Sequence, residues 1–583
     1  MKNSQRRRTK RRIIILVAFS IVWLGALVLR LVQLQVINAK QYRSRVLDQT
    51  QNIIDVNPKR GTIFDRNGTI LARSMPSPSV YFRSSQGETI SSQLDKIKKI
   101  AAICGLSEWE LRNIQSQIEK KSPYIYINRR KIDPDKADLI MDLKLNGIFL
   151  ENENKRFYPQ GKLASHLIGK VDVDDSGQSG VELRYNSVLL GYKGKRLIHK
   201  DAKRRDYQHE IIEQPIPGKD LILTIDETIQ YIAEKELAKA VTTRSADWGI
   251  VIVSHPGTGE ILALANYPDF DLNHPPSKTE EWSKIKAIHD VFDPGSTFKI
   301  ITASAALESG RVSFSDVFDC SKDLKRGGKT FRDHEEFETL AFPDVIIHSS
   351  NIGTIQIGEQ VGEQNLYDMI RTYGYGKKTG VDLPAEAPGL LNPIKDWGPI
   401  SVASISIGYE ISVTAIQMLQ AINVIANRGI ATRPMIVKNI VLNREKNQKQ
   451  PSEYRRVITE DIASQLIDVF QQVTEVGTGT AAHIEGYSTA GKTGTAQKFD
   501  HDIGTYSSSK HTALFVGFAP VEAPLFSMVV VIDNPQGQYY GGQVAAPVFR
   551  EIGRQIFRYL RIPPQPVRPK TFITAENRRT QEQ

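Results

Sequence analysis

Residues 293–300, DPGSTFKI, decide how the rest of the chain is interpreted. Locally the stretch is typical of a helix start, with Asp293 as the expected N-cap and Pro294 at the first helical position. Apolar residues follow as far as Gly310, where we expect the helix to stop. Because these residues are apolar on nearly every side of the predicted helix, the helix is expected to be buried.

Ser296 and Lys299 stand three residues apart in this stretch. Residues at that spacing share one face of a helix, so the Lys299 amine is expected within reach of the Ser296 hydroxyl, where it can take the hydroxyl proton. A position near the helix start also leaves the Ser296 backbone N–H without an intrahelical partner, free to face a developing oxyanion. The spacing alone is weak evidence, because it recurs at residues 283–286 and 507–510.

Two further short motifs follow in order along the chain. Residues 349–351, Ser-Ser-Asn, end a segment of helical character and supply a hydroxyl and an amide close together. Residues 492–495, Lys-Thr-Gly-Thr, stand before the last predicted pair of strands, where a strand can border a cleft. A second Lys-Thr-Gly, at residues 378–380, lies in a glycine-rich loop with no neighbouring strand pattern. Each residue alone is more often a cap, a turn former or a solvated strand end, so only the joint pattern points to catalysis.

The three motifs in this order resemble the signature of penicillin-binding proteins and serine β-lactamases. The longer phrases DVFDPGSTFK, HSSNIG and AGKTGTAQK are similar to class B penicillin-binding proteins in particular. In the amino-terminal part, RGTIFDRNGTILA, RFYPQGKLASHLIG and LTIDETIQ resemble the non-catalytic domain and the junction of that class. The likeness covers nearly all of residues 58–560.

The resemblance implies a catalytic role for four side chains. Ser296 would attack the penultimate D-alanine carbonyl of a peptidoglycan stem pentapeptide, releasing D-alanine and leaving an acyl-enzyme. Lys299 would accept the serine proton, and burial beside the second cation of Lys492 would favour its deprotonated form. Ser349 would relay a proton to the leaving amine, and Asn351 would hold the substrate backbone and orient Lys299. An amine of a neighbouring stem peptide would then take the acyl group and close a cross-link.

The last motif is implied to bind the terminal carboxylate of the substrate, through the Lys492 charge and the hydroxyls of Thr493 and Thr495. Gly494 would leave room for the strand to approach the ligand closely. The backbone N–H groups of Ser296 and Thr495 resemble the oxyanion hole of the family.

No metal or cofactor is expected. The histidines His166, His334 and His348 lack the spacing of metal ligands. Residues 172–183 begin like a calcium loop but end in Leu183, where such a loop needs a glutamate.

The strand and helix patterns, together with the resemblance, predict an α+β fold of the penicillin-binding transpeptidase and serine β-lactamase kind, in which helices cover an antiparallel sheet. The predicted parts are a basic cytoplasmic tail (1–12), a transmembrane anchor (13–37), a smaller α+β pedestal domain of the non-catalytic, dimerisation type (38–215), a transpeptidase domain (216–562) and a disordered tail (563–583). The tail is proline-rich and then polar, a composition that cannot build a core.

A single transmembrane helix is predicted near the amino end. Residues 13–29, IIILVAFSIVWLGALVL, carry no charge, and apolar character resumes after Arg30 as far as Ile37. A cleaved signal peptide is the alternative, but no small-x-small site and no lipobox cysteine follow the apolar run. Seven of the first twelve residues are Lys or Arg. This charge predicts that the amino end stays in the cytoplasm and that the chain after the anchor, with the catalytic domain, is periplasmic or otherwise extracytoplasmic.

Composition excludes several other functions. The 583 residues are 40% hydrophobic, which permits more than one domain with a large core. The net charge of +11 is concentrated in the basic tail, so a nucleic-acid surface is not indicated. The chain lacks a P-loop and a dinucleotide glycine pattern, which argues against phosphoryl transfer. The only cysteines, Cys104 and Cys320, are too few for a disulfide scaffold, and whether they pair stays open.

The segment VVVIDNPQGQYYGGQVAAPVFREIG is more similar to division-type, septal transpeptidases than to the elongation type. The resemblance implies inhibition by β-lactams and partnership with a polytopic glycosyltransferase of the shape, elongation, division and sporulation (SEDS) family and with other division proteins. Three alternatives remain open. One is an elongation-type transpeptidase. Another is a D,D-carboxypeptidase or β-lactamase, in which water takes the acyl group. The third is a penicillin sensor or division scaffold that is acylated without turnover.

Overall fold

The computed structural model describes residues 2–83, 88–120, 122, 125–127, 131–200, 206–276, 284–442, 445–448, 454–500 and 504–564. The chain divides into two compact units, Met1–Lys59 with Gly191–Gly218 and Arg60–Leu190 with Lys219–Gln583. The limits expected at residues 38, 216 and 562 do not follow this division and stay predictions. Of the expected disordered tail, residues 565–583 lie outside the described residues.

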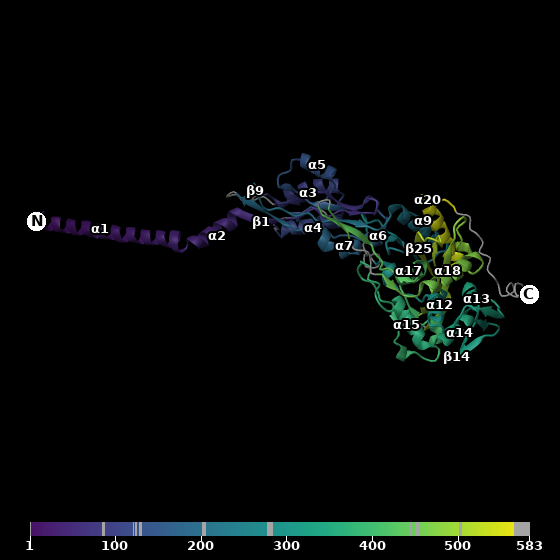
Figure 1. The fold of residues 1–583 in the computed structure, drawn as a ribbon. Helices are drawn as coiled ribbons and strands as arrows, with labels where there is room; N and C mark the ends of the chain where they lie inside the picture. Colours follow the sequence, from purple (N-terminus) through teal and green to yellow (C-terminus); the bar gives the residue numbers. More distant parts are fainter. Residues whose placement is uncertain are drawn as a thin grey trace, which may run out of the picture. The chain divides into compact units, whose positions relative to one another are not determined.

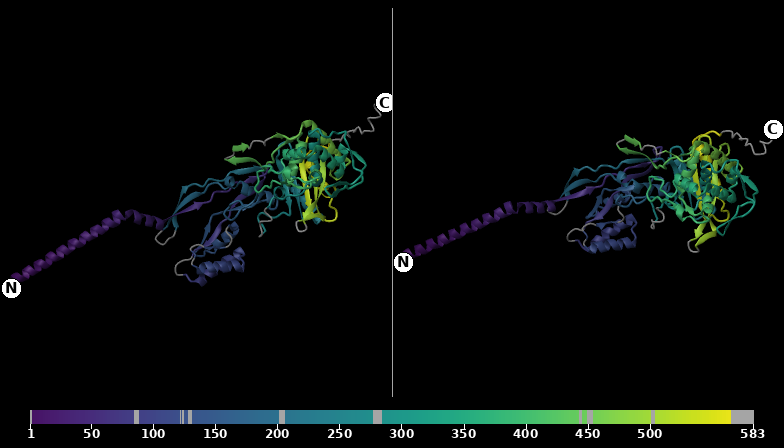
Figure 2. Two further views of the ribbon diagram at one scale, coloured as in Figure 1. Left: turned by 90° about the horizontal axis from the view of Figure 1, so that it is seen from below. Right: turned by 60° about the horizontal axis from the view of Figure 1, so that its bottom comes forward.

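The smaller unit is a helical run followed by a three-stranded antiparallel sheet (Figures 1 and 2). Its elements in chain order are α1 (Lys2–Val32), the π-helix η1 (Gln33–Ile37), α2 (Ala39–Thr50), β1 (Gln51–Val56), β8 (Gly194–Lys200) and β9 (Asp206–Glu213). The central strand β8 pairs with β1 on one side and with β9 on the other. Within the helical run, Gln5–Ile37 is long and apolar enough to cross a membrane.

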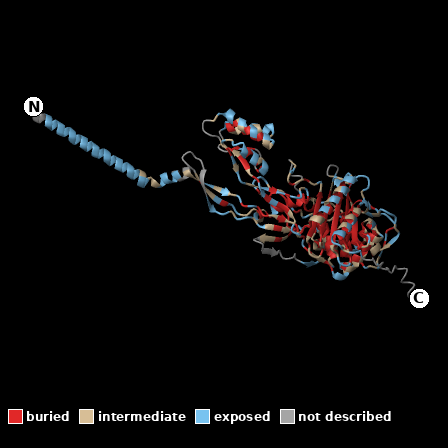
Figure 3. Cartoon of the chain, turned by 90° about the horizontal axis from the view of Figure 1, so that it is seen from above, coloured by how far each residue is buried: buried red, intermediate tan, exposed pale blue. Residues whose placement is uncertain are grey.

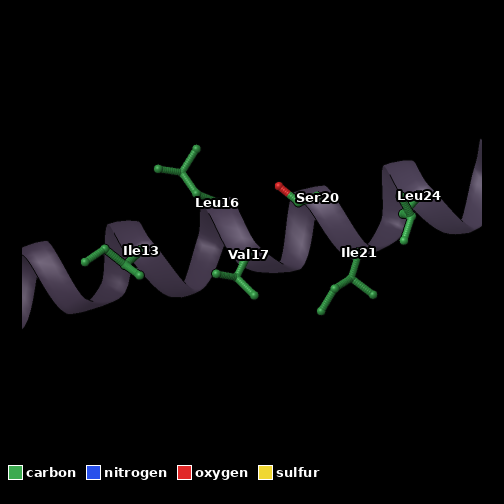
Figure 4. Close-up of a pocket in the computed structure, with 6 residues that line it drawn as sticks. All are labelled: Ile13, Leu16, Val17, Ser20, Ile21 and Leu24. Atoms are coloured by element: carbon green, nitrogen blue, oxygen red, sulfur yellow. The ribbon is translucent and has the colours of Figure 1, made fainter.

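Helix α1 is exposed from Gln5 to Val32 (Figure 3), and its most apolar stretch is not buried against any described residue. One of its faces forms a shallow, open apolar hollow, shown in Figure 4 and lined by Ile13, Leu16, Val17, Ser20, Ile21 and Leu24. Exposed apolar surface is costly in water and stable among lipid chains. The hollow therefore fits a bilayer better than a small ligand.

The amino-terminal part of the larger unit contains a small helical head with its own hydrophobic core. Three helices share this core with a three-stranded sheet. The elements are β4 (Ser79–Phe82), α3 (Ile90–Cys104), α4 (Glu108–Glu119), β5 (Ile125–Tyr126), α5 (Pro134–Asp142) and β6 (Ile148–Glu151). Local sequence fixes the helix starts. Thr89 caps α3, and Ser107 with Glu110 forms a capping box on α4.

A buried ionic cluster holds three segments of this part together. Glu182 accepts hydrogen bonds from Arg60 Nε at 2.7 Å and from Arg156 Nε at 2.6 Å. Their side chains are at most 1% exposed. Arg60 also donates to the backbone oxygen of Asp175 and to the side chain of Asn186. Buried charges are tolerated only when paired in this way.

A six-stranded mixed sheet connects the two halves of the larger unit, with the order β21-β20-β10-β2-β3-β7. Its strands are β2 (Ile63–Phe64), β3 (Ile70–Pro76), β7 (Asn154–Phe157), β10 (Asp220–Leu223), β20 (Val437–Leu442) and β21 (Glu445–Gln448). The pair Asn67-Gly68 between two apolar stretches predicts a hairpin. This prediction is confirmed, since β2 and β3 pair antiparallel on either side of it. Asp226 stands directly before a stretch with the apolar spacing of a helix, which predicts that it is an N-cap. This is also confirmed, because its carboxylate accepts from Thr228 N and Ile229 N at the start of α9 (Glu227–Thr243).

The carboxyl-terminal half is built on a five-stranded antiparallel sheet with the order β12-β11-β25-β24-β23. Its strands are β11 (Trp248–Ser254), β12 (Ile261–Tyr267), β23 (Ala490–Asp500), β24 (Thr505–Ala519) and β25 (Phe526–Asp533). The apolar runs of residues 248–267 and 512–533 predict two strands each. All four are confirmed as β11, β12, β24 and β25. Most of the sheet is buried (Figure 3), except where the end of β23 meets the start of β24, and β23 forms one edge.

Helices cover both faces of this sheet, as the α+β prediction required. On one face α9 and α20 (Ala546–Tyr559) pack on the sheet, and on the other face lies α17 (Ala415–Ala426) (Figure 1). Alternate residues of a strand belong to different cores, as on β11, where Val251 faces α9 and α20, and Ile252 faces the other core. The alternation explains why these strands are apolar without a break.

The helical middle of this half lies on the side of α17 and supplies most of the remaining elements. The helices are α13 (Phe342–Ile347), α14 (Asn351–Val361), α15 (Glu363–Tyr373), α16 (Ser401–Ser406) and α18 (Glu460–Glu475). Short helices and turns are α6 (Ser165–Ile168), α7 (Gly180–Arg184), α8 (Asn186–Leu189), α11 (Lys286–His289), η3 (Ile394–Asp396), η4 (Thr480–Ala482) and α19 (Gly541–Val544). Short strands are β13 (Val317–Asp319), β14 (Leu324–Arg326), β15 (Lys329–Phe331), β16 (Thr339–Ala341), β17 (Leu390–Leu391), β18 (Ile411–Ser412), β19 (Ile430–Ala431) and β22 (Arg455–Arg456).

The buried ionic cluster gives a stability prediction. Glu182→Gln leaves two buried guanidinium groups without their shared carboxylate, so we expect the free energy of unfolding of the larger unit to fall by about 3–5 kcal/mol. Urea denaturation of the full chain measures the loss. The matched control is Glu551→Gln, which breaks the exposed pair with Arg554 and should cost at most about 1 kcal/mol. Equal losses in the two variants would contradict a structural role for the cluster.

Candidate active site

Ser296 lies in a short 3-10 helix, η2 (Gly295–Phe298), which leads directly into α12 (Lys299–Glu308). Gly295 has a left-handed φ of 52°, and a Cβ on it would lie 2.9 Å from the carbonyl oxygen of Thr495 on β23. A Cβ on Gly408 would lie 2.1 Å from the Gly295 carbonyl oxygen. Only glycine allows these approaches, so the half-buried Ser296 is held close to β23 and to the loop after α16.

The prediction that Asp293 caps this helix is wrong. η2 has no side-chain cap, and the Asp293 carboxylate instead accepts from the Tyr506 hydroxyl at 2.7 Å and from the Ser412 hydroxyl at 3.1 Å. Burial raises the pKa of Asp293 despite both hydrogen bonds. The cause lies in the tertiary structure, because β24 and β18 bring two hydroxyl donors that sequence proximity does not reveal.

Lys299 begins α12 and is completely buried. Its Nζ donates to four oxygens: Ser349 O at 2.6 Å, Asn351 Oδ1 at 2.9 Å, Ser350 O at 3.1 Å and Ser349 Oγ at 3.3 Å. Among the described residues, Ser296 Oγ has no hydrogen bond. The amine therefore lies among the oxygens of the Ser-Ser-Asn motif, one helical turn from Ser296.

Ser349 connects Lys299 to the third motif. It lies between α13 and α14 with a left-handed φ of 58°, which is uncommon outside glycine. Its hydroxyl accepts from Lys492 Nζ at 2.9 Å as well as from Lys299. Lys492 comes from β23 and is also completely buried. The three motifs, far apart in the sequence, thus meet at one hydroxyl.

Burial changes the acidity of both amines. Desolvation lowers the pKa of Lys299 to about 7, against the opposing charge of Asp333 and the neighbouring Cys320 thiol. The pKa of Lys492 is also lowered well below its usual value, first by desolvation and then by the positive charge of Lys299. Two ammonium groups cannot both remain charged cheaply in so small a volume. A neutral amine beside Ser349 is therefore accessible near pH 7.

The threonines of β23 have partners of their own. Thr493 Oγ1 shares a hydrogen bond of 2.7 Å with Thr478 Oγ1, from the loop after α18. Thr495 Oγ1 accepts from Gly541 N at 2.9 Å. A Cβ on Gly541 would lie 2.2 Å from Gly494 O, so the start of α19 is packed directly on the strand. Both hydroxyls are thus fixed in position before any ligand arrives.

Packing explains why position 494 is a glycine, and the sequence did not reveal this reason. A Cβ on it would lie 2.8 Å from Thr297 Cγ2 and 3.1 Å from Pro294 O. The glycine therefore allows β23 to approach the segment that carries Ser296. The role expected for it, close approach of the strand to a ligand, stays a prediction.

Sequence reasoning missed Asp333, which organises the Ser-Ser-Asn motif. Its carboxylate accepts from Ser350 Oγ at 2.6 Å, from Asn351 N and from Ile352 N at 3.1 Å. These donors lie at the start of α14, so the carboxylate satisfies N–H groups that the helix leaves free. Ser350 Oγ accepts from Gly353 N as the N-cap. An aspartate 18 residues before its partner carries no pattern that could have identified it.

Thr478 was missed for the same reason. It is an ordinary loop residue in sequence, and only its contact with Thr493 gives it a place in the site.

Two other expectations concern the backbone and metals. Ser296 N–H has no partner among the described residues, as expected in the first turn of a helix, and β23 is an edge strand whose outer N–H groups are not used by the sheet. Their use as an oxyanion hole stays a prediction. Within the described residues no group of three His, Cys, Asp or Glu side chains is arranged to hold a metal ion.

Comparison with protein families assigns both parts of the chain. Residues 249–554 match the penicillin binding protein transpeptidase domain, and residues 55–223 match the penicillin-binding protein dimerisation domain. Stage V sporulation protein D of Bacillus subtilis is 32% identical over 577 residues, 95% of this chain and 87% of that protein. Peptidoglycan D,D-transpeptidase FtsI of Escherichia coli K12 is 32% identical over 539 residues, 92% of this chain and 89% of that protein.

Solved structures agree with the family match. A peptidoglycan synthetase from Bifidobacterium adolescentis superposes with a TM-score of 0.71 at 25% identity, over 89% of this chain and 98% of that one. Penicillin binding protein 3 from Mycobacterium tuberculosis, complexed with aztreonam, superposes with a TM-score of 0.69 at 26% identity, over 88% of this chain and 98% of that one. The predicted fold is confirmed.

The contact between Asp333 and the motif gives a testable pH effect. If a neutral Lys299 takes the Ser296 proton, the acylation rate with labelled penicillin should rise as the pH passes about 7, where that amine loses its proton. Asp333 raises the pKa of Lys299, so Asp333→Asn should move this rise to lower pH. In this variant the acylation rate at the high-pH plateau should also fall by about tenfold or more, because a hydrogen bond to a charged group contributes about 1.5–3 kcal/mol.

The measurement is the second-order acylation rate constant from pH 5 to 9. Asp323→Asn serves as control, since it removes an exposed carboxylate that pairs with Arg332, next to Asp333 in the chain. A rise at the same pH in Asp333→Asn and wild type would show that Asp333 does not act on the titrating amine.

Proposed function

The chain belongs to the class B penicillin-binding proteins, and on this premise we propose that it cross-links peptidoglycan stem peptides through an acyl-enzyme on Ser296. It is a serine-type D,D-transpeptidase of the FtsI kind, which acts in septal wall synthesis and is inhibited by β-lactams. The observation that carries the proposal is the Ser349 hydroxyl, which lies between the buried amines of Lys299 and Lys492.

Acylation begins with the neutral amine of Lys299. The amine takes the Ser296 proton while Ser296 Oγ attacks the penultimate D-alanine carbonyl and forms a tetrahedral intermediate. Collapse breaks the peptide C–N bond, and the leaving D-alanine amine takes a proton through the Ser349 hydroxyl, which contacts both lysines. Asn351 accepts from Lys299 through Oδ1 and donates to Arg332 O through Nδ2, so its amide holds the base in one orientation.

The developing oxyanion and the substrate carboxylate are held by two sets of groups. The backbone N–H groups of Ser296 and Thr495 stabilise the oxyanion, because donors already in position need no reorganisation during the reaction. The hydroxyls of Thr493 and Thr495, with the charge of Lys492, bind the terminal carboxylate. The hydrogen bonds that fix both threonines support this role.

Deacylation repeats these steps in reverse with a new nucleophile. A primary amine of a second stem peptide loses a proton to the base, and its nitrogen bonds to the acyl carbon. The ester bond to Ser296 Oγ then breaks, and the oxygen regains its proton. The product is an amide cross-link, and the enzyme returns to its starting state.

The membrane helix supports a location in the cytoplasmic membrane. The protein is a single-pass membrane protein with the basic residues of its amino end in the cytoplasm, since such residues are retained on that side. The catalytic half then faces the extracytoplasmic space, where the substrate is. We include a polytopic SEDS glycosyltransferase and other division proteins as partners, on the strength of the family resemblance alone.

Labelling tests the nucleophile. Labelled penicillin should attach covalently to the full chain and be released slowly, and Ser296→Ala should abolish labelling while the melting curve stays unchanged. Ser507→Ala is the matched control, because Ser507 and Lys510 repeat the Ser-x-x-Lys spacing elsewhere. A labelled Ser296→Ala variant would place the nucleophile at another residue.

Acceptor partitioning tests the reaction class. With a D-alanyl-D-alanine-type thioester donor and a D-amino acid, the wild-type chain should form the exchange product, and the product fraction should rise with amine concentration. Hydrolysed acid as sole product under saturating amine would favour a carboxypeptidase or β-lactamase. Acylation without turnover would favour a penicillin sensor or scaffold.

A further inference from the structure

The ammonium of Lys329 lies among three aromatic rings. Its Nζ is 5.1 Å from the ring centroid of Phe331, 5.7 Å from that of Tyr409 and 5.9 Å from that of Tyr506. The rings come from three separate segments: β15, the loop after α16, and β24. Lys329 itself is exposed, whereas Phe331 is buried and the two tyrosines are half-buried. We call these three rings the aromatic cage.

The cage is fixed by its own packing. The rings of Tyr409 and Tyr506 meet edge to face, with centroids 5.2 Å apart. Tyr506 also meets the ring of Phe499 edge to face at 5.5 Å. The Tyr506 hydroxyl donates to Asp293. Burial raises the pKa of Tyr409, and the backbone of Gln497 beside its hydroxyl opposes this rise. The rings are therefore pre-arranged and do not depend on the lysine for their position.

These contacts place the cage beside the candidate active site. Gly408 is the residue before Tyr409, and its carbonyl oxygen accepts a hydrogen bond of 3.1 Å from the N–H of Gly295. Gly295 directly precedes Ser296 in the chain. Gln497, which Tyr409 contacts, lies two residues beyond Thr495 on β23. Asp293, which Tyr506 contacts, lies three residues before Ser296. The cage therefore flanks both the nucleophile segment and the strand that borders it.

Three aromatic faces around one point form a binding site for a cation. Ring faces carry negative charge density, and ammonium groups are attracted to them most strongly where water is partly excluded. The lysine is a replaceable occupant, because its exposed side chain can swing into solvent without a change in the backbone. The hairpin that carries it stays anchored, since Arg326 makes a two-bond contact with Glu359 on α14.

We propose that the aromatic cage of Phe331, Tyr409 and Tyr506 is a subsite for the primary ammonium of a stem peptide, and that Lys329 occupies it while no substrate is bound. The proposal rests on the transpeptidase function proposed above. It adds that the enzyme recognises the stem peptide by its primary ammonium group. Cross-linking requires a primary amine on the acceptor stem, and such an amine is protonated in neutral water. Stems of one polymer act as donor and as acceptor, so both carry this group.

Binding of a model cation tests the site without turnover. The probe is tetramethylammonium, and its neutral counterpart of the same shape is tert-butyl alcohol. In saturation-transfer NMR with the full chain in detergent, Lys329→Ala should bind tetramethylammonium several-fold more tightly than wild type, because the competing ammonium is gone. The alcohol should give no comparable signal. Phe331→Leu in the Lys329→Ala background should weaken the cation signal, with a melting curve as the check on folding.

The matched control is Lys325→Ala, which removes a positive charge from the same hairpin but not from the cage. Equal cation binding in Lys325→Ala and Lys329→Ala would overturn the proposal, and so would equal binding of the cation and the alcohol. Because this measurement needs no reaction, its failure is distinct from a failure of Ser296 to acylate.

Kinetics then distinguishes the two sources of the ammonium. One arm uses a thioester donor whose side chain carries a free amine, against its acetylated twin, and measures kcat/KM for acylation. The other arm uses the acetylated donor and measures the concentration of amine acceptor that gives half-maximal aminolysis. In at least one arm Lys329→Ala should have an effect of about three- to tenfold, as the strength of a partly exposed cation–π contact predicts. The effect is a higher kcat/KM for the donor with a free amine, or a lower acceptor concentration at half-maximal aminolysis. The arm that responds shows whether the cage binds the ammonium of the donor stem or that of the acceptor stem. No response in either arm would overturn the proposal.

Discussion

The site depends on the burial of two lysine amines against one serine hydroxyl. Lys299 and Lys492 are both fully buried, and both donate to Ser349 Oγ. Placing two like charges in a low dielectric is costly, so the fold itself favours loss of a proton from this pair. A general base near neutral pH is thus a consequence of packing and requires no histidine. The carboxylate of Asp333 limits the effect, because its charge opposes the lowering of the pKa of Lys299.

Close backbone contacts make that burial possible. Gly295, Gly408, Gly494 and Gly541 each lie where a Cβ would meet backbone at about 3.1 Å or less. These contacts bring the nucleophile segment, β23, the loop after α16 and the start of α19 together. The five-stranded sheet supplies a rigid support, with cores on both faces. Elsewhere in the larger unit, the six-stranded sheet ties the amino-terminal part to the same body through β2, β10 and β20. Gly408, which accepts a hydrogen bond from Gly295 N, directly precedes Tyr409, so the aromatic cage begins next to these close contacts.

Local signals predicted much of the fold. The hairpin at residues 67–68, the Asp226 cap of α9 and the apolar strands of the main sheet all follow from short-range turn, capping and periodicity rules. The same rules failed at Asp293, because two hydroxyl groups from distant strands compete for its carboxylate. Asp333 and Thr478 had no signal at all, since each acts through a partner remote in the sequence. The aromatic cage was missed for this reason too, as its three rings come from three segments.

The sequence by itself determined which chemical groups are available and in what order: a serine and lysine one helical turn apart, a Ser-Ser-Asn motif, a Lys-Thr-Gly-Thr strand, and an apolar helix preceded by basic residues. Their resemblance to a known family followed from that order. Only the tertiary structure decided which oxygens surround Lys299, how far its pKa falls, and which residues fix the threonines of β23. The physical reason is that residue identity and short-range spacing are local properties. Desolvation and charge coupling depend on everything within a few ångströms, and in this site those neighbours come from four separate stretches of chain.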